Sequence, residues 1–199
     1  MPPTADGERF AEETHQLLLA SNAILEGDHF VYDSGEHGSG WIDKDAVDVH
    51  PERIDRLCEL LAELVRDFHA EIVCGPATGG LEIAQDTARH LGALAIFAEH
   101  TAAAPDRAGG PVRGAFELRR GFDRIAAGKR VIVVDDVINT GLAIRQTVDV
   151  VRAAGGNVVG AGALVSRGNA TLADLGVTDA RWLLTVPRLG APAYSGRTS

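Results

Sequence analysis

Residues 130–143 read RVIVVDDVINTGLA, and this stretch decides the fold. It begins with four consecutive β-branched residues at 131–134, a short apolar run that is typical of a strand buried on both faces of a parallel sheet. Two carboxylates, Asp135 and Asp136, follow at the point where that strand is expected to end. Residues 139–141, Asn-Thr-Gly, then form a turn of small residues. The stretch therefore predicts one strand–turn–helix unit of an α/β protein.

The turn at 139–141 is a candidate anion site, because a helical run over about 142–154 follows it directly. Ligands of open α/β sheets bind beyond the carboxyl ends of the strands. The first amides of a helix offer unpaired N–H donors and the positive end of the helix dipole, which suits a phosphate. Two neighbouring carboxylates can accept hydrogen bonds from hydroxyls, so a phosphorylated sugar fits. The simpler alternative is an Asp-capped helix, but a cap needs one acid rather than two.

A second turn of this kind occurs at 75–80, GPATGG, between a predicted strand at 71–74 and a helix that runs to about Leu91. A glycine-rich turn lets main-chain N–H groups approach a ligand closely. The pattern GxxxxGK[ST] is absent from the sequence, so this is not a P-loop. A connecting turn without a ligand is the alternative interpretation.

Strands and helices alternate along the chain, which predicts a parallel sheet with right-handed crossovers. An amphipathic helix is expected over 8–25, and a second helix begins at Pro51 and continues to Phe68. Further strands are expected at 94–98, 116–119, 157–165 and 181–186, the last as an edge strand.

The length of 199 residues and the hydrophobic content of 45% predict a single domain with a full core. Within it we expect a small hood over about 1–50, a core over about 51–186 and a flexible tail at 187–199. The connection at 101–114 is long and rich in small residues. Long irregular loops in compact domains are often functional lids.

The net charge of −9 argues against a general nucleic-acid or membrane-surface binder. The sequence has no apolar run of about 18 residues and no signal-peptide pattern, so we expect a cytoplasmic protein. Cys58 and Cys74 belong to no CxxC or metal spacing and are expected to be reduced core thiols. The seven histidines show no zinc-ligand spacing, and no metal ligand is assigned with certainty.

The run at 131–143 resembles the phosphoribosyl-pyrophosphate (PRPP) signature of the type I phosphoribosyltransferases. That signature has four apolar residues, two acids, two apolar residues and a Thr/Gly-rich turn; Asn139 stands where the family more often has Thr, Ser or Ala. The resemblance implies the fold of that family, with a central, mostly parallel sheet flanked by helices. It also implies that Asp135 and Asp136 hold the ribose hydroxyls, that the turn after them wraps the 5′-phosphate, and that the turn at 75–80 binds pyrophosphate. The residues it assigns to PRPP are Ala77, Thr78, Gly79, Gly80, Asp135, Asp136, Val137, Ile138, Asn139, Thr140, Gly141, Leu142 and Ala143.

Residues 29–44, HFVYDSGEHGSGWIDK, resemble the hood of orotate phosphoribosyltransferases. That resemblance implies base contacts from Trp41 and Ile42, and an Arg167 guanidinium that meets the carboxylate of orotate, which a guanidinium can bind bidentately. The alternatives are a core aromatic for Trp41 and a solvated loop cation for Arg167. The complete set expected on the base side is Trp41, Ile42, Lys44, Asn139 and Arg167.

Several cations of the orotate enzymes are replaced in this sequence. Asp33 and Gly79 stand where many of those enzymes have lysines, and their lid is rich in Lys and Arg. The corresponding stretch here offers only His100, Arg107 and Arg113. Arg113 is therefore the expected proton donor to the leaving group, with His100 as the alternative. Further positive charge is expected from Lys44, Arg119 or Arg120.

The resemblance implies transfer of a phosphoribosyl group from PRPP to a nucleobase, with orotate favoured, with Mg²⁺ as the cofactor and in a homodimer. Mg²⁺ is expected near Asp135 and Asp136. Two other functions remain open: transfer to another base, and PRPP binding by a regulatory protein without catalysis. A receiver-like domain is disfavoured, because that fold carries its acidic pair at the first strand and this pair lies after residue 130.

Overall fold

The computed structural model describes residues 5–31, 37–43, 45–101, 115–168 and 170–186. Its centre is a six-stranded sheet in the order β5-β4-β3-β6-β7-β8. These strands are β3 (Ile72–Pro76), β4 (Leu94–His100), β5 (Phe116–Glu117), β6 (Arg130–Ile138), β7 (Asn157–Ser166) and β8 (Ala180–Thr185). Neighbouring strands pair in parallel except for β5, which returns antiparallel to β4. The predicted mostly parallel sheet is confirmed, and β8 is an edge strand as expected.

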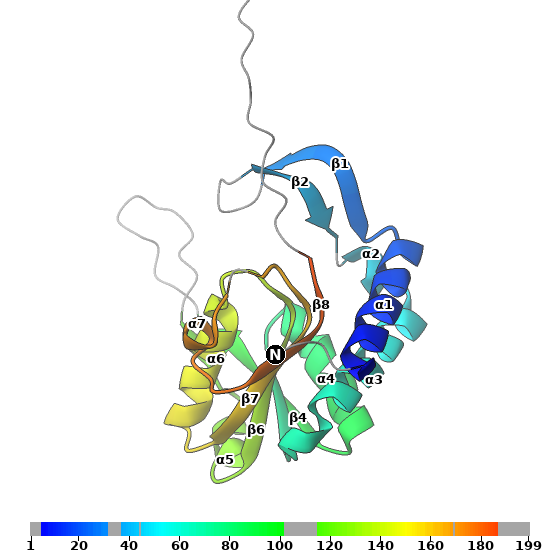
Figure 1. The fold of residues 1–199 in the computed structure, drawn as a ribbon. Coiled ribbons are helices and arrows are strands. Elements are labelled where there is room, and N and C mark those ends of the chain that lie inside the picture. Colours follow the sequence, from blue (N-terminus) through cyan, green and yellow to red (C-terminus); the bar gives the residue numbers. More distant parts are fainter. Residues whose placement is uncertain (1–4, 32–36, 44, 102–114, 169, 187–199) are drawn as a thin grey trace, which may run out of the picture.

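The β-branched run of β6 occupies the middle of the sheet (Figure 1), where β6 pairs with both β3 and β7. Successive side chains of a strand point to opposite faces. Ile132 and Val134 accordingly belong to one core cluster, whereas Val131 and Val133 pack on the other side of the sheet. All four side chains are fully buried. The continuous apolar run therefore has the physical cause inferred from the sequence, namely burial on both faces.

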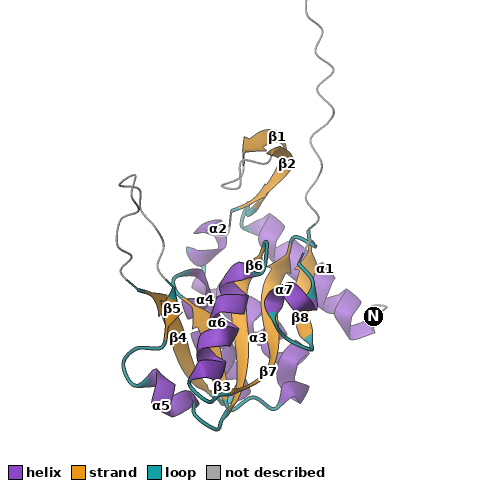
Figure 2. Cartoon of the chain, turned by 90° about the vertical axis from the view of Figure 1, so that its left-hand side faces the viewer, coloured by secondary structure: helices purple, strands orange, loops and turns teal. Residues whose placement is uncertain are grey.

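Helices cover both faces of the sheet (Figure 2). One core cluster packs α1 (Ala5–Ala20), α3 (Pro51–Val65) and α4 (Gly79–Leu91) against one face. The opposite face carries α5 (Phe122–Ala126), α6 (Leu142–Ala153) and α7 (Leu172–Leu175). A short 3₁₀ helix, η1 (Arg66–Phe68), follows α3. The two cysteines lie in these cores as free, buried thiols.

The first helix is shorter at its C-terminal end than the predicted span of 8–25. α1 ends at Ala20, and Asn22 adopts a left-handed backbone with a φ of 53°. Asparagine tolerates this conformation and commonly terminates helices. The chain then enters β1 (Ile24–Val31), so Ile24, which falls within the predicted helix, is in fact the first residue of a strand.

β1 forms an antiparallel pair with β2 (His37–Ile42), which rises beside the carboxyl ends of the main strands and leads into α2 (Asp45–Asp48) (Figure 1). α1 itself packs into the main core through Phe10 and Leu18. The expected division into a hood over about 1–50, a core over about 51–186 and a tail at 187–199 stays a prediction, and 187–199 lies outside the described residues.

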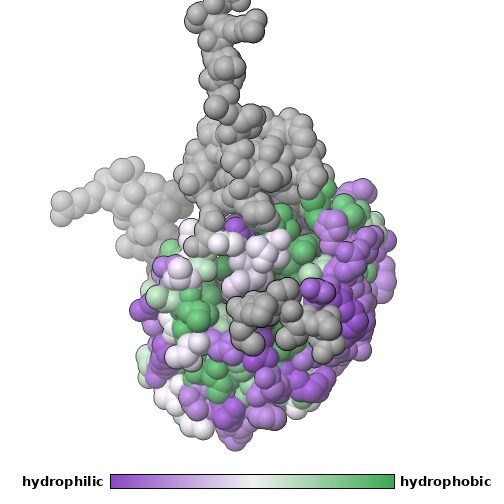
Figure 3. All heavy atoms as spheres, viewed as in Figure 1, coloured by the Kyte–Doolittle hydropathy of each residue, from purple (hydrophilic) through white to green (hydrophobic). Residues whose placement is uncertain are grey.

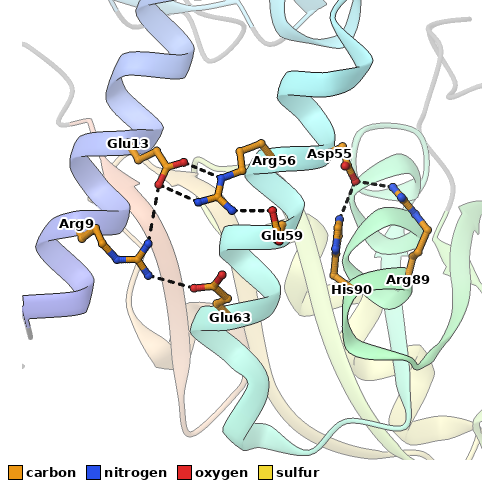
Figure 4. A network of polar contacts seen from close by, with 8 residues as sticks. All are labelled: Arg9, Glu13, Asp55, Arg56, Glu59, Glu63, Arg89 and His90. Carbon is orange, nitrogen blue, oxygen red and sulfur yellow. Dashed lines mark hydrogen bonds and ion pairs between the residues drawn. The ribbon is translucent and has the colours of Figure 1, made fainter.

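Charged side chains tie the three helices of one face together (Figure 4). Arg56 of α3 donates to Glu13 of α1, with 2.6 Å between Nε and Oε1, and this contact lowers the pKa of the Glu13 carboxyl. Asp55 of α3 contacts both Arg89 and His90 of α4. The remaining members of the network are Arg9, Glu59 and Glu63. The outer side of the molecule over α1 and α3 is correspondingly hydrophilic (Figure 3).

Among the described residues, no helix combines the length and the apolar character that a bilayer crossing requires.

Candidate active site

The two turns singled out in the sequence open into one cavity of about 670 Å³. It lies where β3 and β6 end and where α4 and α6 begin. Residues 76–79 form one wall, and residues 135–144 form the other. His100 at the end of β4, Phe116 of β5 and Gln146 of α6 complete the described lining. The turns are separated by about 60 residues in the chain, and the parallel pairing of β3 with β6 brings them together.

The two carboxylates belong to the last part of β6 rather than to the loop after it. The strand continues to Ile138, and Asp135 pairs in register with Ala163 of β7. The strand was expected to end before these acids, so its predicted boundary was wrong. Asp135 is only 7% exposed, and its Oδ1 accepts the main-chain N–H of Asp136 at 3.0 Å. Asp136 Oδ1 in turn accepts the N–H of Val137 at 2.5 Å. The sheet and these hydrogen bonds hold both side chains.

Two glycines let the first turn of α4 approach these acids. A Cβ on Gly79 would come within 2.4 Å of Asp136 Oδ2, and one on Gly80 would come within 3.1 Å of Asp135 Oδ1 and 2.9 Å of the Val134 carbonyl oxygen. Side chains do not tolerate contacts this close. The glycine pair is therefore required for the observed distance between the turn and the acids.

The turn between β6 and α6 has the geometry of an anion cradle. Gly141 has a φ of 81°, a left-handed conformation that favours glycine, and α6 begins at the next residue. Thr140 and Leu142 are exposed at the cavity, and Thr140 Oγ1 accepts the N–H of Leu142 at 3.4 Å. Residues 142–144 at the start of this 12-residue helix line the cavity, so the N-terminal end of α6 lies beside it.

His100 brings an ionisable base to the cavity. The pairing of β4 with β5 sets it opposite Phe116, and the two rings stack with their centroids 4.0 Å apart. Of the lining residues that the structure describes, His100 is the one whose side chain can carry a positive charge. Arg119 and Arg120, which were expected to add charge, instead contact Glu117 and Glu99 and do not contribute to the described lining.

Arg167 does not behave as a solvated loop cation. It is 5% exposed, and its main-chain N–H donates to the Ile138 carbonyl at 2.9 Å, so it lies beside the end of β6. It is not among the described residues that line the cavity. The alternative of an exposed position is wrong, whereas contact with a base stays a prediction.

Other expected residues fall outside what the structure describes. Trp41 and Ile42 lie in β2, but the placement of their side chains is not described. Lys44 and Arg113 lie outside the described residues altogether, together with the rest of the segment 102–114.

Sequence reasoning missed four lining residues, namely Pro76, Phe116, Ile144 and Gln146. Gln146 could have been predicted from the sequence, because residues four apart share a helix face and Leu142 was already assigned to the phosphate turn. Phe116 had no such signal, because its position depends on the register of the short return strand β5.

A parallel sheet whose neighbouring strand–helix turns and paired carboxylates share one cavity defines a class of proteins that bind phosphorylated sugars. Comparison with known proteins specifies the class further. The family model of the phosphoribosyl transferase domain matches residues 43–179. The chain belongs to the phosphoribosyltransferase family and is an enzyme of that type.

Relatives and solved structures agree with this assignment. The chain is 37% identical over 186 residues to the orotate phosphoribosyltransferase of Methylorubrum populi, covering 92% of this chain and 86% of that one. The crystal structure of orotate phosphoribosyltransferase from Aeropyrum pernix superposes with a TM-score of 0.66 at 28% identity, covering 86% of this chain and 92% of that one. An adenine phosphoribosyltransferase from Thermoanaerobacter pseudethanolicus shares the fold, with a TM-score of 0.65 at 18% identity over 88% of this chain and 99% of that one. The fold is that of the type I phosphoribosyltransferases.

Proposed function

We propose that this chain transfers the 5-phosphoribosyl group of PRPP to orotate, which gives orotidine 5′-phosphate and pyrophosphate in pyrimidine nucleotide biosynthesis. The observation that carries the proposal is the single cavity shared by both turns and both carboxylates. The identity of 37% to an orotate phosphoribosyltransferase across 92% of the chain supports orotate as the acceptor.

The ribose phosphate half of PRPP is assigned to the wall formed by β6 and α6. Asp135 and Asp136 accept hydrogen bonds from the 2′- and 3′-hydroxyls, which carboxylates do well because the bonds are charge-assisted. The 5′-phosphate occupies the turn at 139–143, where the first amides of α6 and its dipole favour an anion. Val137 and Ile138 supply the main chain between these two groups.

Pyrophosphate is assigned to the opposite wall, where Thr78 and Gly79 at the start of α4 line the cavity and can offer main-chain N–H groups. The N–H of Ala77 donates to the Ala98 carbonyl of β4 at 2.7 Å. No lysine is available in this turn, since Gly79 occupies that place. His100 lines the same cavity and is the described side chain best placed to offset charge on the departing oxygens. Arg113 remains the second candidate for that role.

In the proposed reaction the bond from C1 to the pyrophosphate oxygen breaks, and a bond from C1 to a ring nitrogen of orotate forms. The pyrophosphate oxygen leaves with the electron pair of the broken bond, and the base nitrogen supplies the pair for the new one. That nitrogen loses its proton to water, and the pyrophosphate oxygen can take up a proton as it leaves. C1 becomes cationic on the way, so the protein accelerates the step mainly by positioning and by electrostatic stabilisation. The carboxylates of Asp135 and Asp136 fix the ribose and lie on the side where that positive charge develops.

Magnesium fits this site only together with the substrate. Among the described residues, no group of three or more His, Cys, Asp or Glu side chains could hold a metal ion. Mg²⁺ is, however, commonly bound by one or two carboxylates plus substrate phosphates, with retained water. Asp135 and Asp136 are the carboxylates that would contribute, and the ion would offset the charge of the pyrophosphate.

The base is proposed to lie on the side of β2, in contact with Trp41, Ile42, Lys44, Asn139 and Arg167. Asn139 lines the cavity, which supports its place in this set. We also propose that the enzyme acts in the cytoplasm as a homodimer, in which each lid segment, 101–114, reaches the partner's site. Sedimentation at micromolar concentration tests the dimer, and a purely monomeric species would contradict it.

The sequence also left open PRPP binding without turnover by a regulatory protein, and membership in a family of enzymes disfavours that function. The described cavity lining contains His100 but no lysine or arginine. Transfer to another base is the third possibility. A panel of bases with PRPP and Mg²⁺, followed by pyrophosphate detection and by calorimetry, separates the three: orotate turnover, turnover of another base, or binding alone.

A further inference from the structure

The conformation of the phosphate turn depends on a contact with a distant segment. A Cβ on Gly141 would come within 2.6 Å of Leu175 Cδ2 and 3.5 Å of the Ala170 Cβ. Leu175 ends α7, lies 34 residues further along the chain and is fully buried. It shares a core cluster with Ile138 and Ile144, the residues on either side of the turn. The turn therefore rests directly on the Leu175 side chain.

α7 is a single helical turn that other interactions hold in place. Thr171 caps its start in a reciprocal capping box with Asp174, and Gly176 ends it with a left-handed φ of 70°. A capping box satisfies two otherwise orphan amide donors. A helix of four residues has no stability of its own in water, so its position must come from contacts to the rest of the chain.

Two arginines of α6 supply those contacts. Arg145 Nη1 donates to the Ala173 carbonyl at 3.1 Å, and Arg152 Nη1 donates to the Gly176 carbonyl at 2.8 Å. A Cβ on Gly176 would come within 2.6 Å of Arg145 Cδ, so the arginine side chain lies flat on the end of α7. α6 thus holds α7, while α7 packs under the turn from which α6 begins.

We infer that Leu175, held by Arg145, is a positioning residue for the substrate phosphate: it fixes Gly141 and with it the amides of the phosphate turn. This rests on the proposed binding of the 5′-phosphate at 139–143. Neither residue is among the described cavity lining, so both act through the turn. The amides bind an anion best when their orientation is fixed before binding, because binding otherwise has to order the turn as well.

The inference is tested by calorimetric titration of PRPP with Mg²⁺ into wild type and variants. Leu175→Ala removes the contact, and we expect about tenfold or more weaker PRPP binding, as a displaced site commonly shows. Leu60→Ala is the matched control: Leu60 is also fully buried, but in the cluster on the other face of the sheet. Both variants should lower the melting temperature, and only Leu175→Ala should weaken binding. Leu175→Met, which refills the volume, should restore most of the affinity.

A surface variant keeps the test valid if Leu175→Ala fails to fold. Arg145→Met removes the bond to the Ala173 carbonyl without opening a core cavity, and should weaken PRPP binding about threefold or more, given that one hydrogen bond from a charged donor is lost. Asp149→Asn breaks only the Arg145–Asp149 ion pair. Arg124→Met removes an arginine from α5, at the opposite end of the sheet (Figure 2). Both controls should bind PRPP as wild type does.

The outcomes separate this inference from the proposed function. Wild-type chain that does not bind PRPP overturns the proposed function itself. Wild type that binds PRPP, with Leu175→Ala and Arg145→Met unchanged in affinity, overturns the positioning role alone. An equal loss of PRPP affinity in Leu60→Ala and Leu175→Ala would also overturn the positioning role, because the loss would then result from global destabilisation.

Discussion

The Asp136 carboxylate lies directly against the main chain of Gly79, so closely that a Cβ at residue 79 would come within 2.4 Å of Oδ2. This contact joins the two walls of the cavity. In this arrangement a side chain at residue 79 fits only if the Asp136 carboxylate moves.

Gly79→Ala should weaken PRPP binding without lowering the stability of the fold. Alanine is up to about 1 kcal/mol better than glycine in a helix, so the fold should tolerate the change. The added methyl group displaces Asp136, and PRPP affinity should fall about tenfold or more. Calorimetry and thermal unfolding measure the two effects. Gly92→Ala at the other end of α4 is the control. Its φ of 68° makes alanine strained but no atom lies within 4 Å, so stability should fall and affinity should not. Unchanged PRPP affinity in Gly79→Ala would count against the assignment of this wall.

His100 is the side chain in the described lining that can carry a positive charge. Replacement by Gln keeps hydrogen-bonding capacity but removes that ability, and we expect pyrophosphate affinity to fall about three- to tenfold, as for one charge-assisted hydrogen bond. His100→Lys should retain or exceed wild-type affinity. The measurement is competition of inorganic pyrophosphate with PRPP. His15→Gln on α1 removes a histidine from outside the cavity lining and should have no effect. Wild-type affinity in His100→Gln would remove this residue from the pyrophosphate site.

The two cysteines should be inert in the folded chain. Burial raises the pKa of the Cys58 and Cys74 thiols to about 12, and the thiolate is the reactive form. A thiol reagent at about pH 8 should therefore label neither residue in native protein, and should label both after denaturation. Rapid labelling of either thiol under native conditions would show that its helix or strand opens.

The contact of α3 with α4 should make stability depend on pH. His90 and Arg89 lower the pKa of Asp55 below its ordinary value of 3.8. A carboxylate whose pKa is lowered on folding stabilises the native state above its unfolded pKa, and that stabilisation is lost as the pH falls through 3.8 toward the folded pKa. Because the pair is half-exposed, Asp55→Asn should cost only about 0.2–1 kcal/mol at neutral pH.

Urea unfolding at a series of pH values measures this effect. The difference between wild type and Asp55→Asn should shrink as the pH falls through 3.8, and it should vanish only below the lowered folded pKa of Asp55, where that carboxyl is protonated in both the native and the unfolded state. Asp123→Asn, which removes a carboxylate of α5, is the control and should keep the difference between neutral and acid conditions seen in wild type. If Asp55→Asn lowers the free energy of unfolding by the same amount at every pH, the effect comes from packing and not from the charge of Asp55.

The sequence predicted those parts of the fold and site that depend on local pattern. The β-branched run of β6, the two glycine-containing turns and the paired acids each follow from short-range chemistry, and the parallel sheet brings them together. The predictions failed where tertiary contacts decide. α1 ends at Ala20, just before the left-handed Asn22, instead of continuing to Leu25, and β6 extends past Asp136 because β7 continues to pair with it.

The burial of individual side chains could not be predicted from local sequence patterns either. Arg167 follows a strand in a polar context, which suggests a solvated cation, yet its main chain is bonded to Ile138 and the residue is buried. Leu175 reads as an ordinary helix residue, and its contact with Gly141 depends on how α7 folds back on α6. Such contacts can be predicted only when the relative positions of several helices and strands are known.

The central claim is that one PRPP molecule spans both turns, with its ribose held by Asp135 and Asp136. The most direct measurement is the loss of orotate absorbance in the presence of PRPP and Mg²⁺, with the wild type and Asp136→Asn compared side by side, together with the PRPP affinity of each. We expect turnover by the wild type, and an affinity for PRPP reduced about tenfold or more in the variant, since a charge-assisted hydrogen bond is lost. PRPP affinity that is the same in Asp136→Asn as in the wild type would contradict the account.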